Sequence, residues 1–166
     1  MANPRIPYRF SNDGPQLKPH PKGAIMVHLV VNVEHWQFDA SMPRTIITPP
    51  HGKETVPDVP NWSWHEYGMR VGFWRFHDLY QKLGIKPTLS INARVCEDYP
   101  RVAQACLDAG WEFMGHSYQQ GPIHLEPDQP AMIKRSLDVI EKFTGKRPVG
   151  WLGPGLTQTN ETPDHL

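Results

Sequence analysis

The sequence AIMVHLVVNVEHWQF, residues 24–38, decides which fold the chain can adopt. Its apolar run over 25–33 shows no alternation of apolar and polar residues, which is typical of a strand buried on both faces of a parallel sheet. The run ends in Glu34, His35 and Trp36. Polar groups are costly in a core but are tolerated at the carboxyl ends of parallel strands, where ligands bind. We therefore predict a strand over 24–33 with an active site beginning at its carboxyl end.

Three later segments repeat one pattern, in which a helix with an apolar stripe ends at a glycine and a short strand follows. We expect helices over 67–83, 99–109 and 130–144, glycine stops at Gly84, Gly110 and Gly145, and strands over 87–91, 111–115 and 148–152. The stripe of the first helix consists of Met69, Phe73, Phe76, Tyr80 and Leu83. Alternating helices and strands predict a parallel sheet with right-handed crossovers.

The residues before the first strand form a separate, proline-rich segment. Residues 1–23 contain Pro4, Pro7, Pro15, Pro19 and Pro21. Because proline fixes φ and removes a hydrogen-bond donor, this composition predicts an extended arm outside the domain of residues 24–166. The arm is expected to be a strap over the domain surface, a disordered tail, or a segment exchanged between subunits.

A second irregular segment is predicted over residues 37–66, which contain several prolines but also Trp62, Trp64 and His65. Long loops inside compact domains are usually functional or disordered, and this aromatic content is unlike that of a disordered segment. Two interpretations stay open: the segment forms a lid or pocket wall, or its aromatic residues simply cover one end of a barrel.

The end of the chain resembles the beginning of a helix, with Thr162 as the N-cap and Pro163 at the first helical position. Three residues follow Pro163, too few to sustain a helix. The predicted strands would also leave an open sheet edge, which invites unwanted pairing. We therefore expect about four βα units of a barrel that is truncated at its C-terminus.

Composition excludes some classes of partner. The chain has 166 residues and a formal net charge of zero, which argues against nucleic acid or an anionic membrane as its main partner. No apolar run approaches the ~20 residues of a membrane span, and the N-terminus lacks the apolar region of a signal peptide. Cys96 and Cys106 form no CxxC pair, so we expect a reducing, cytoplasmic compartment, with Cys106 in the core.

Polar residues follow the predicted strands at their carboxyl ends. Glu34 follows the first strand, Asn92 the second, and His116 and Ser117 the third. Because these ends share one face of a parallel barrel, we expect the side chains to converge on one cavity. Elsewhere we expect a core position for His28, surface or loop positions for His65 and His77, and solvent-facing positions for Arg70 and Arg75.

Four stretches also carry a family resemblance: VNVEHW at 31–36, YGMRVGFWRFHDLYQKLGIKPTLSINARV at 67–95, GWEFMGHSYQQ at 110–120 and GKRPVGWLGPGLTQTNETPDHL at 145–166. They resemble the polysaccharide deacetylase (NodB-homology) superfamily, and more narrowly its allantoinase-like branch. The resemblance implies an α/β fold, a deformed (β/α) barrel. It also implies hydrolysis of non-peptide carbon–nitrogen bonds, either in N-acetyl groups on sugars or in cyclic amides and ureides.

The chain departs from the metal-dependent members of that superfamily. Those enzymes carry paired aspartates after the first strand, where this chain has Glu34 and His35. They also carry two histidines four residues apart, where it has His116 and Gln120. An arginine expected near residues 151–155 is absent as well. These departures resemble the allantoinase-like branch, which is thought to work without a metal, so the resemblance implies no cofactor.

A divalent metal is the alternative. Catalytic zinc takes three protein ligands and keeps one position open. Glu34 and His116 supply two, and His124 would have to complete the set through a favourable loop conformation.

Hydrolysis of a ring amide needs an activated water, a stabilised oxyanion and a proton for the leaving nitrogen. We predict that Glu34 and His116 are the catalytic pair, with the pKa of Glu34 raised by burial. Substrate contacts are predicted for His35, Trp36, Ser117, Gln120, Trp151, Pro154 and Gly155. Gln120 and Ser117 would hydrogen-bond the ring, and the indoles would stack on it. Trp151 could equally belong to the core, and His35 could point away from Glu34.

The sequence thus predicts a hydrolase that opens a cyclic amide or ureide. One alternative is a metal-dependent N-deacetylase of an acetylated sugar, and another is a non-catalytic module that binds a small molecule or carbohydrate. The expected partners are a small-molecule substrate and a second copy of the chain, and the truncated barrel could be inactive by itself.

Overall fold

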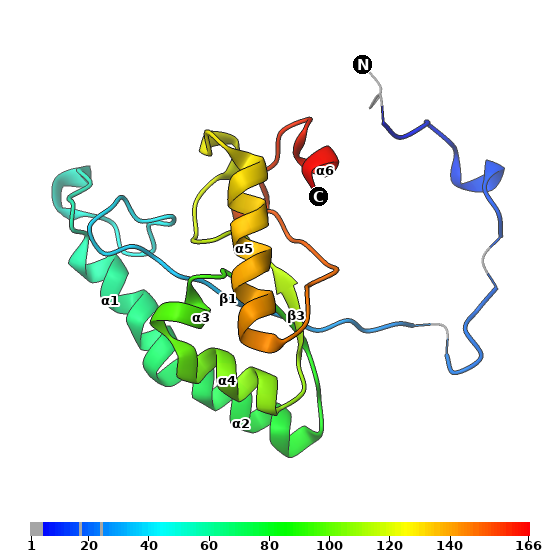
Figure 1. Cartoon of the computed structure of the whole chain (residues 1–166), viewed down its shortest axis with the longest axis horizontal. Coiled ribbons are helices and arrows are strands. Elements are labelled where there is room, and N and C mark those ends of the chain that lie inside the picture. The colour runs from blue at the N-terminus through cyan, green and yellow to red at the C-terminus, as the bar shows by residue number, and fades with distance from the viewer. Residues whose placement is uncertain (1–4, 17, 24) are drawn as a thin grey trace.

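The computed structural model describes residues 5–16, 18–23 and 25–166, and it has the predicted α/β fold. A parallel sheet runs in the order β1 (Val30–Val33), β2 (Thr88–Ile91) and β3 (Glu112–Gly115). Its register aligns Val33 with Ile91 and Ile91 with Gly115. Figure 1 shows the helices packed around this small sheet, with the N-terminal residues leading away from the body.

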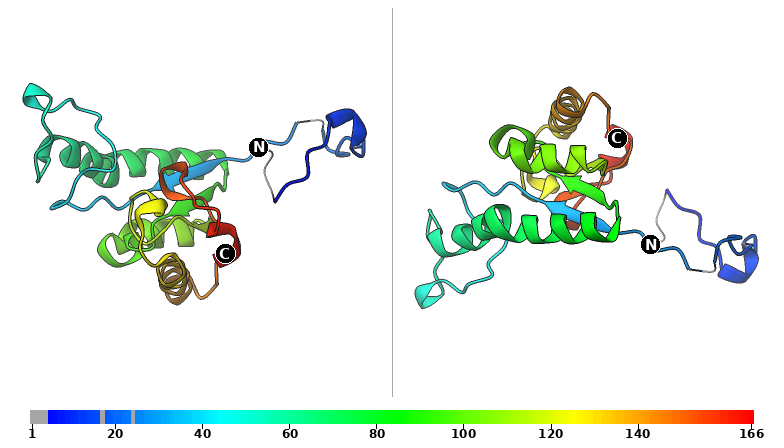
Figure 2. Two further views of the ribbon diagram at one scale, coloured as in Figure 1. Left: turned by 90° about the horizontal axis from the view of Figure 1, so that it is seen from above. Right: turned by 90° about the horizontal axis from the view of Figure 1, so that it is seen from below.

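The helices follow the predicted order along the chain. They are α1 (Val59–Tyr67), α2 (Phe73–Leu83), α3 (Val95–Asp98), α4 (Pro100–Asp108), α5 (Gln129–Thr144) and α6 (Thr162–His165). A π-helical turn, η3 (Gly68–Gly72), joins α1 to α2. Short 3-10 turns are η1 (Ser11–Asp13), η2 (Pro50–Gly52), η4 (Ile123–Leu125) and η5 (Pro154–Leu156). Figure 2 shows α1 and α2 as one long rod beside the sheet.

The main core lies between one face of the sheet and the helices. Alternate strand residues, Leu89 and Ile91 among them, are fully buried against apolar side chains of α2, α4 and α5. Cys106 lies in this core, as predicted, and burial raises the pKa of its thiol to about 12. The intervening residues point to the opposite face, where Ser90 and Asn92 are buried as well.

The first strand is shorter than predicted. Of residues 24–33, only Val30–Val33 form a strand; Ile25 and Met26 are each 85% exposed, His28 is exposed rather than in the core, and Ala24 lies outside the described residues. The prediction was wrong because a strand is buried on both faces only when neighbours flank it. Within the described part of the chain, β1 pairs with β2 alone and forms an edge of the sheet.

The first helical rod begins earlier than predicted, at Val59 rather than residue 67. The Asp58 side chain accepts a hydrogen bond from Asn61 N at 3.2 Å, and Pro60 occupies the first turn, where its missing N–H costs nothing. The irregular segment therefore ends at Asp58, and Trp62, Trp64 and His65 are helical. The stripe predicted on the helix over 67–83 is buried at Met69, in η3, and at Phe73, in α2, but exposed at Phe76 and Leu83.

Three other elements differ in detail. The helix predicted over 99–109 is α4, and the short helix α3 precedes it without having been predicted. Helix α5 begins at Gln129, capped by Asp128. The strand predicted over 148–152 is reduced to a single parallel bridge between Trp151 and Gly115. The last helix contains Thr162 as its first residue rather than as its N-cap, which is Glu161.

The described residues of the 1–23 segment form one 3-10 turn and otherwise irregular structure (Figure 1). Arg5 returns toward the end of the chain, where its Nη2 lies 2.5 Å from Asp164 Oδ2. An exposed ion pair of this kind contributes little to stability. Of the helices described, none combines the length and the apolar character needed to cross a bilayer.

Candidate active site

The strand register places three polar residues side by side. Since Val33, Ile91 and Gly115 are aligned, the next residues in line are Glu34, Asn92 and His116. Backbone bonds from Asn92 N to Val33 O and from His116 N to Ile91 O continue the ladder to that point. All three side chains therefore start from the same end and the same face of the sheet.

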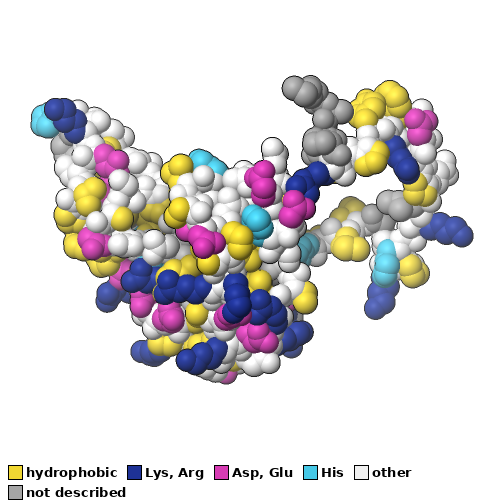
Figure 3. Space-filling view, turned by 45° about the horizontal axis from the view of Figure 1, so that its top comes forward, with side chains coloured by type: hydrophobic (Ala, Val, Ile, Leu, Met, Phe, Trp, Pro, Cys, Tyr) yellow, Lys and Arg dark blue, Asp and Glu magenta, His cyan; other side chains and the backbone are white. Residues whose placement is uncertain are grey.

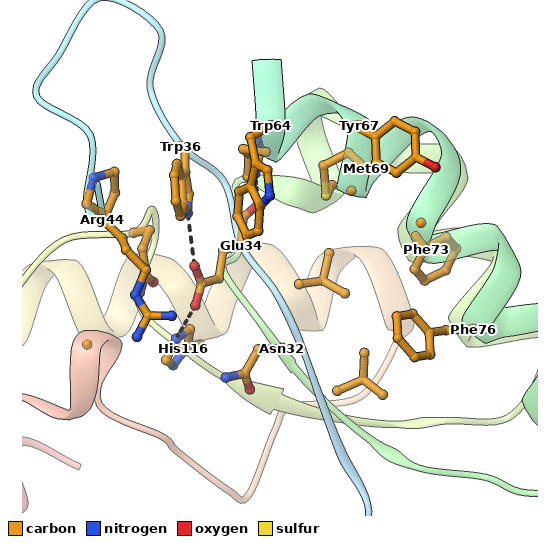
Figure 4. A pocket seen from close by; sticks show the side chains of 18 of the residues that line it. Asn32, Glu34, Trp36, Arg44, Trp64, Tyr67, Met69, Phe73, Phe76 and His116 are labelled. Atoms are coloured by element: carbon orange, nitrogen blue, oxygen red, sulfur yellow. Dashed lines mark hydrogen bonds and ion pairs between the residues drawn. The ribbon is translucent and has the colours of Figure 1, made fainter. Parts of the chain in front are cut away.

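An open cavity of about 810 Å³ covers this end of the sheet. Figure 4 shows Glu34, His116 and Trp36 together at one side of it and apolar residues of α2 at the other. Of the residues predicted to form the site, those that line the cavity are Glu34, Trp36, His116, Gln120 and Gly155.

The orientation of His116 is set by the backbone. Its Nδ1 lies 2.7 Å from the carbonyl oxygen of Leu152, so Nδ1 carries a proton and donates it to that oxygen. Nε2 then points toward Glu34, 3.7 Å from its Oε1, and has no hydrogen-bond partner within the described structure. His116 is only 2% exposed. Because Nδ1 is bonded to the Leu152 carbonyl and Nε2 is not bonded, Nε2 is the ring atom that can exchange a proton with a bound substrate.

The pKa of Glu34 is lowered rather than raised, which corrects the sequence prediction. Burial raises this pKa, but the nearby imidazole of His116 and the indole N–H of Trp36 outweigh the burial. Trp36 Nε1 donates to Glu34 Oε2 at 2.9 Å, leaving Oε1 facing His116. Glu34 is therefore a partly buried carboxylate that stays ionised at neutral pH.

Aromatic side chains form one wall of the cavity beside the Glu34 carboxylate. The Trp36 ring stacks on His65, with centroids 5.1 Å apart and planes 17° apart, and Trp64 lies 6.0 Å from Trp36. His65 Nε2 donates to the backbone oxygen of Glu34 at 2.7 Å. Burial lowers the pKa of His65, so its ring is neutral at neutral pH. The prediction that His65 lies at the surface or in a loop was wrong; the Asp58 cap was the signal that it is helical.

Arg44 is a second residue of the cavity lining that was not predicted from the sequence. It belongs to the irregular segment before α1, and its side chain points into the cavity from the side opposite Trp64 (Figure 4). No local pattern marked it, because a loop arginine becomes part of a site only through the path of the loop.

His35 and Ser117 do not line the cavity. His35 directly follows Glu34 and Ser117 directly follows His116, so their side chains point to the other face of the sheet. His35 Nε2 lies 2.7 Å from Asp98 Oδ2, and burial lowers the pKa of His35. Ser117 has a φ of 69° and directs its hydroxyl to Met132 Sδ at 3.1 Å.

Trp151 and Pro154 also lie outside the cavity. Trp151 packs in a small apolar cluster with Ile123 and Met132. Its ring passes so close to Gly115 that an added Cβ there would lie 2.7 Å from Trp151 Cε3. Trp151 therefore packs against the core, as the alternative prediction had it, and Pro154 is fully buried.

The described residues do not gather a complete set of metal ligands. Glu34 Oε1 and His116 Nε2 form a pair of donors, but His124 is exposed and lies outside the cavity lining. No group of three or more His, Cys, Asp or Glu side chains suited to a metal occurs among residues 5–16, 18–23 and 25–166. The donor set therefore falls short of the three protein ligands of a catalytic zinc.

Comparison with known proteins agrees with this architecture. A family model described as polysaccharide deacetylase matches residues 62–166. The peptidoglycan deacetylase-like protein FGM2 of Gibberella zeae is 29% identical over 138 residues, which are 81% of this chain and 39% of that protein.

Two solved structures share the fold. A probable polysaccharide deacetylase from Pseudomonas aeruginosa PAO1 has a TM-score of 0.66 and 24% identity, covering 83% of this chain and 49% of the other. PuuE allantoinase has a TM-score of 0.65 and 22% identity, covering 83% of this chain and 48% of the other. The chain thus spans about half the length of these structures. Since the family model covers more than half of the chain, the chain belongs to the polysaccharide deacetylase family, within the NodB-homology superfamily.

Proposed function

We propose that this chain carries the active site of a hydrolase for non-peptide carbon–nitrogen bonds, and that its substrate is a cyclic amide or ureide. The observation that supports this most directly is the Glu34–His116 pair, which faces one cavity from the ends of β1 and β3. The chemistry of the lining supports ring opening over metal-dependent deacetylation, because Glu34 and His116 supply only two of the three protein ligands of a catalytic zinc. In fold the chain is about equally similar to PuuE allantoinase and to a probable polysaccharide deacetylase, so the fold does not separate the two reactions.

In the proposed reaction, Glu34 takes a proton from a water molecule whose oxygen attacks the carbonyl carbon of the ring. Its lowered pKa keeps it ionised for this step. The guanidinium of Arg44 is the lining cation that can stabilise the oxyanion. When the carbon–nitrogen bond breaks, the leaving nitrogen takes a proton from protonated His116 Nε2. Transfer of the first proton from Glu34 to His116 restores the pair.

The lining fits a flat, polar ring. Trp36 and Trp64 offer aromatic faces on which a planar amide can stack, and the Gln120 amide provides a donor and an acceptor for ring N–H and C=O groups. Leu152 fixes the His116 ring through its carbonyl, so the proton-exchanging nitrogen keeps its direction during the reaction.

The test is ring opening of allantoin, hydantoins and cyclic imides by the purified chain, with and without a chelator. We expect Glu34→Gln and His116→Ala each to lower kcat by about 10²–10⁴-fold, the usual contribution of a general acid or base. Matched controls are Glu112→Gln, at the opposite end of β3, and His77→Ala, a half-buried histidine on α2, and both should keep the wild-type rate. Unchanged turnover in Glu34→Gln would refute the assignment.

Deacetylation of an amino sugar is the second candidate, and the name of the G. zeae relative favours it. It predicts release of acetate from N-acetylated oligosaccharides, loss of that activity with a chelator, and stoichiometric zinc in the purified protein. Ligand binding without turnover of either substrate class would instead indicate a binding module.

A further inference from the structure

Asn92 is fully buried, although its amide can make several hydrogen bonds. Its Oδ1 accepts a hydrogen bond from the backbone N–H of His35 at 2.8 Å. Its Nδ2 donates to the backbone oxygen of His116 and lies 3.4 Å from Gln120 Oε1. The side chain therefore joins the chain just after β1 to the chain just after β3.

This link lies where the sheet itself no longer holds β1. In the described structure, the final backbone bond between β1 and β2 runs from Asn92 N to Val33 O, one residue before Glu34. Beyond that point β2 continues to pair with the β3 side, through Ala93 N and Ser117 O. A backbone bond from Gln120 N to His35 O, 3.0 Å long, supports the same junction from the loop after β3.

We infer that Asn92 is a positioning residue that sets the separation of Glu34 and His116 across the end of β2. The inference rests on the proposed function of that pair. The bonds of Asn92 to His35 N and His116 O are to backbone atoms of, or next to, the paired residues, so they fix where each side chain begins. Since misplacement of a catalytic group by about 1 Å can cost ~10²-fold in rate, a rigid link at this position has a catalytic consequence.

If Asn92 had only a structural role, replacing it would still destabilise the fold. The test therefore needs a measurement that does not change when stability alone changes. The pKa of Glu34 provides it. The charged or titratable groups facing that carboxylate are His116 from the end of β3, His65 from α1 and Arg44 from the irregular segment, together with the Trp36 N–H. Among these, the imidazole of His116 is the group whose distance from Glu34 depends on Asn92.

The experiment compares wild type, Asn92→Ala, Asn92→Ser and Ser90→Ala. Ser90 is the matched control: it is fully buried on β2, points to the same face as Asn92, and its hydroxyl has no partner in the described structure. The measurements are kcat and KM for ring opening, the pH–rate profile, and a ¹³C NMR titration of the Glu34 carboxyl.

For Asn92→Ala we expect kcat to fall by about 10²-fold with little change in KM, because the pair is misplaced while the rest of the cavity is kept. The acidic limb of the pH–rate profile and the NMR titration of Glu34 should both move up toward the ordinary pKa of a glutamate. Asn92→Ser is neutral, and its short side chain cannot bond both His35 N–H and the His116 carbonyl, so it should change in the same direction. Ser90→Ala should match wild type.

The inference fails if folded Asn92→Ala titrates Glu34 as wild type does and keeps its kcat. If the alanine variant does not fold, the neutral Asn92→Ser variant decides by the same measurements. If the chain opens no ring substrate at all, the proposed function fails, but the Glu34 titration still decides the inference: an unchanged pKa in the Asn92 variants overturns it and a raised pKa supports it.

Discussion

At the scale of single residues, the site depends on how each polar atom of Glu34 is used. Oε2 accepts from the Trp36 indole, Oε1 faces His116, and the backbone oxygen accepts from His65. These contacts offset the cost of burying a carboxylate, and they leave one oxygen directed into the cavity. Glu34 is thereby held ionised in a position where an isolated carboxylate would tend to be protonated.

The pH dependence of stability follows from this arrangement. Because the pKa of Glu34 is lower in the folded protein than in the unfolded chain, its charge stabilises the fold above its ordinary pKa. That contribution is lost as the pH falls through the lowered folded value. We expect wild type to be more stable than Glu34→Gln by about 1 kcal/mol at neutral pH, the difference between a charged and a neutral hydrogen bond, and equally stable in strong acid.

Urea unfolding of both proteins at several pH values measures this difference. The control is Glu112→Gln, which removes an exposed carboxylate from the other end of the sheet. A gap between wild type and Glu34→Gln that stays constant from neutral pH into strong acid would show that the charge of Glu34 does not stabilise the fold.

At the scale of elements, the rod of α1, η3 and α2 builds one wall of the cavity. Asp58 caps α1, and Asn61 joins the cap to the preceding loop by accepting from Ile46 N and Ile47 N at 2.7 and 2.8 Å. The π-helical turn at Gly68–Gly72 lines the cavity between Trp64 and Phe73. Such turns add a residue to the helical path and re-aim the side chains that follow.

The cap of α1 should therefore matter for the site as well as for stability. We expect Asp58→Ala to lower the free energy of unfolding by about 1–2 kcal/mol, because it removes a buried N-cap and leaves the Asn61 amide with one partner fewer. It should also change the fluorescence of Trp36 and Trp64, since His65 on α1 stacks on Trp36.

The matched control is Asp128→Ala, which removes the exposed N-cap of α5, away from the cavity. It should cost about 1 kcal/mol or less and leave the indole fluorescence unchanged. Equal fluorescence changes in the two variants would contradict a specific role of the α1 cap in the site.

At the scale of the whole molecule, β1 is an edge strand of the sheet among the residues that the structure describes. The segment before it carries Ile25, Met26 and Val27, all strongly exposed, and Figure 3 shows hydrophobic side chains along this part of the chain. An unpaired strand edge next to exposed apolar side chains favours pairing with another chain. Edge-to-edge pairing at β1 is a way in which the homo-oligomer expected from the sequence could form, and the homo-oligomer stays a prediction.

We expect the protein to associate as its concentration rises, and Val27→Lys to weaken that association with little change in Tm. A charge beside a strand edge opposes pairing, and Val27 is 76% exposed, so its replacement leaves the core intact. Light scattering over a concentration series measures the effect. The control is Val149→Lys, which is 90% exposed but lies far from β1 in the sequence. Equal effects of the two lysines would rule out the β1 edge as the contact.

The amino-acid sequence by itself determined the order of strands and helices, their glycine ends and the position of Glu34 and His116 at strand ends. These features are local, because apolar periodicity, caps and stops act within a few residues of one another. The alignment of Glu34 with His116 also followed, once the strands were taken as parallel and adjacent. The resemblance to the polysaccharide deacetylase superfamily, carried by stretches between residues 31 and 166, was confirmed by the family model that matches residues 62–166.

Tertiary structure alone decided which neighbours of that pair share the cavity. His35 and Ser117 point away because alternate strand residues face opposite sides, and Trp151 packs beside Gly115. Arg44 and His65 enter the site from a loop and a helix whose paths depend on long-range packing. The direction of the Glu34 pKa was decided there too, since it depends on which N–H groups surround the carboxylate once the chain is folded.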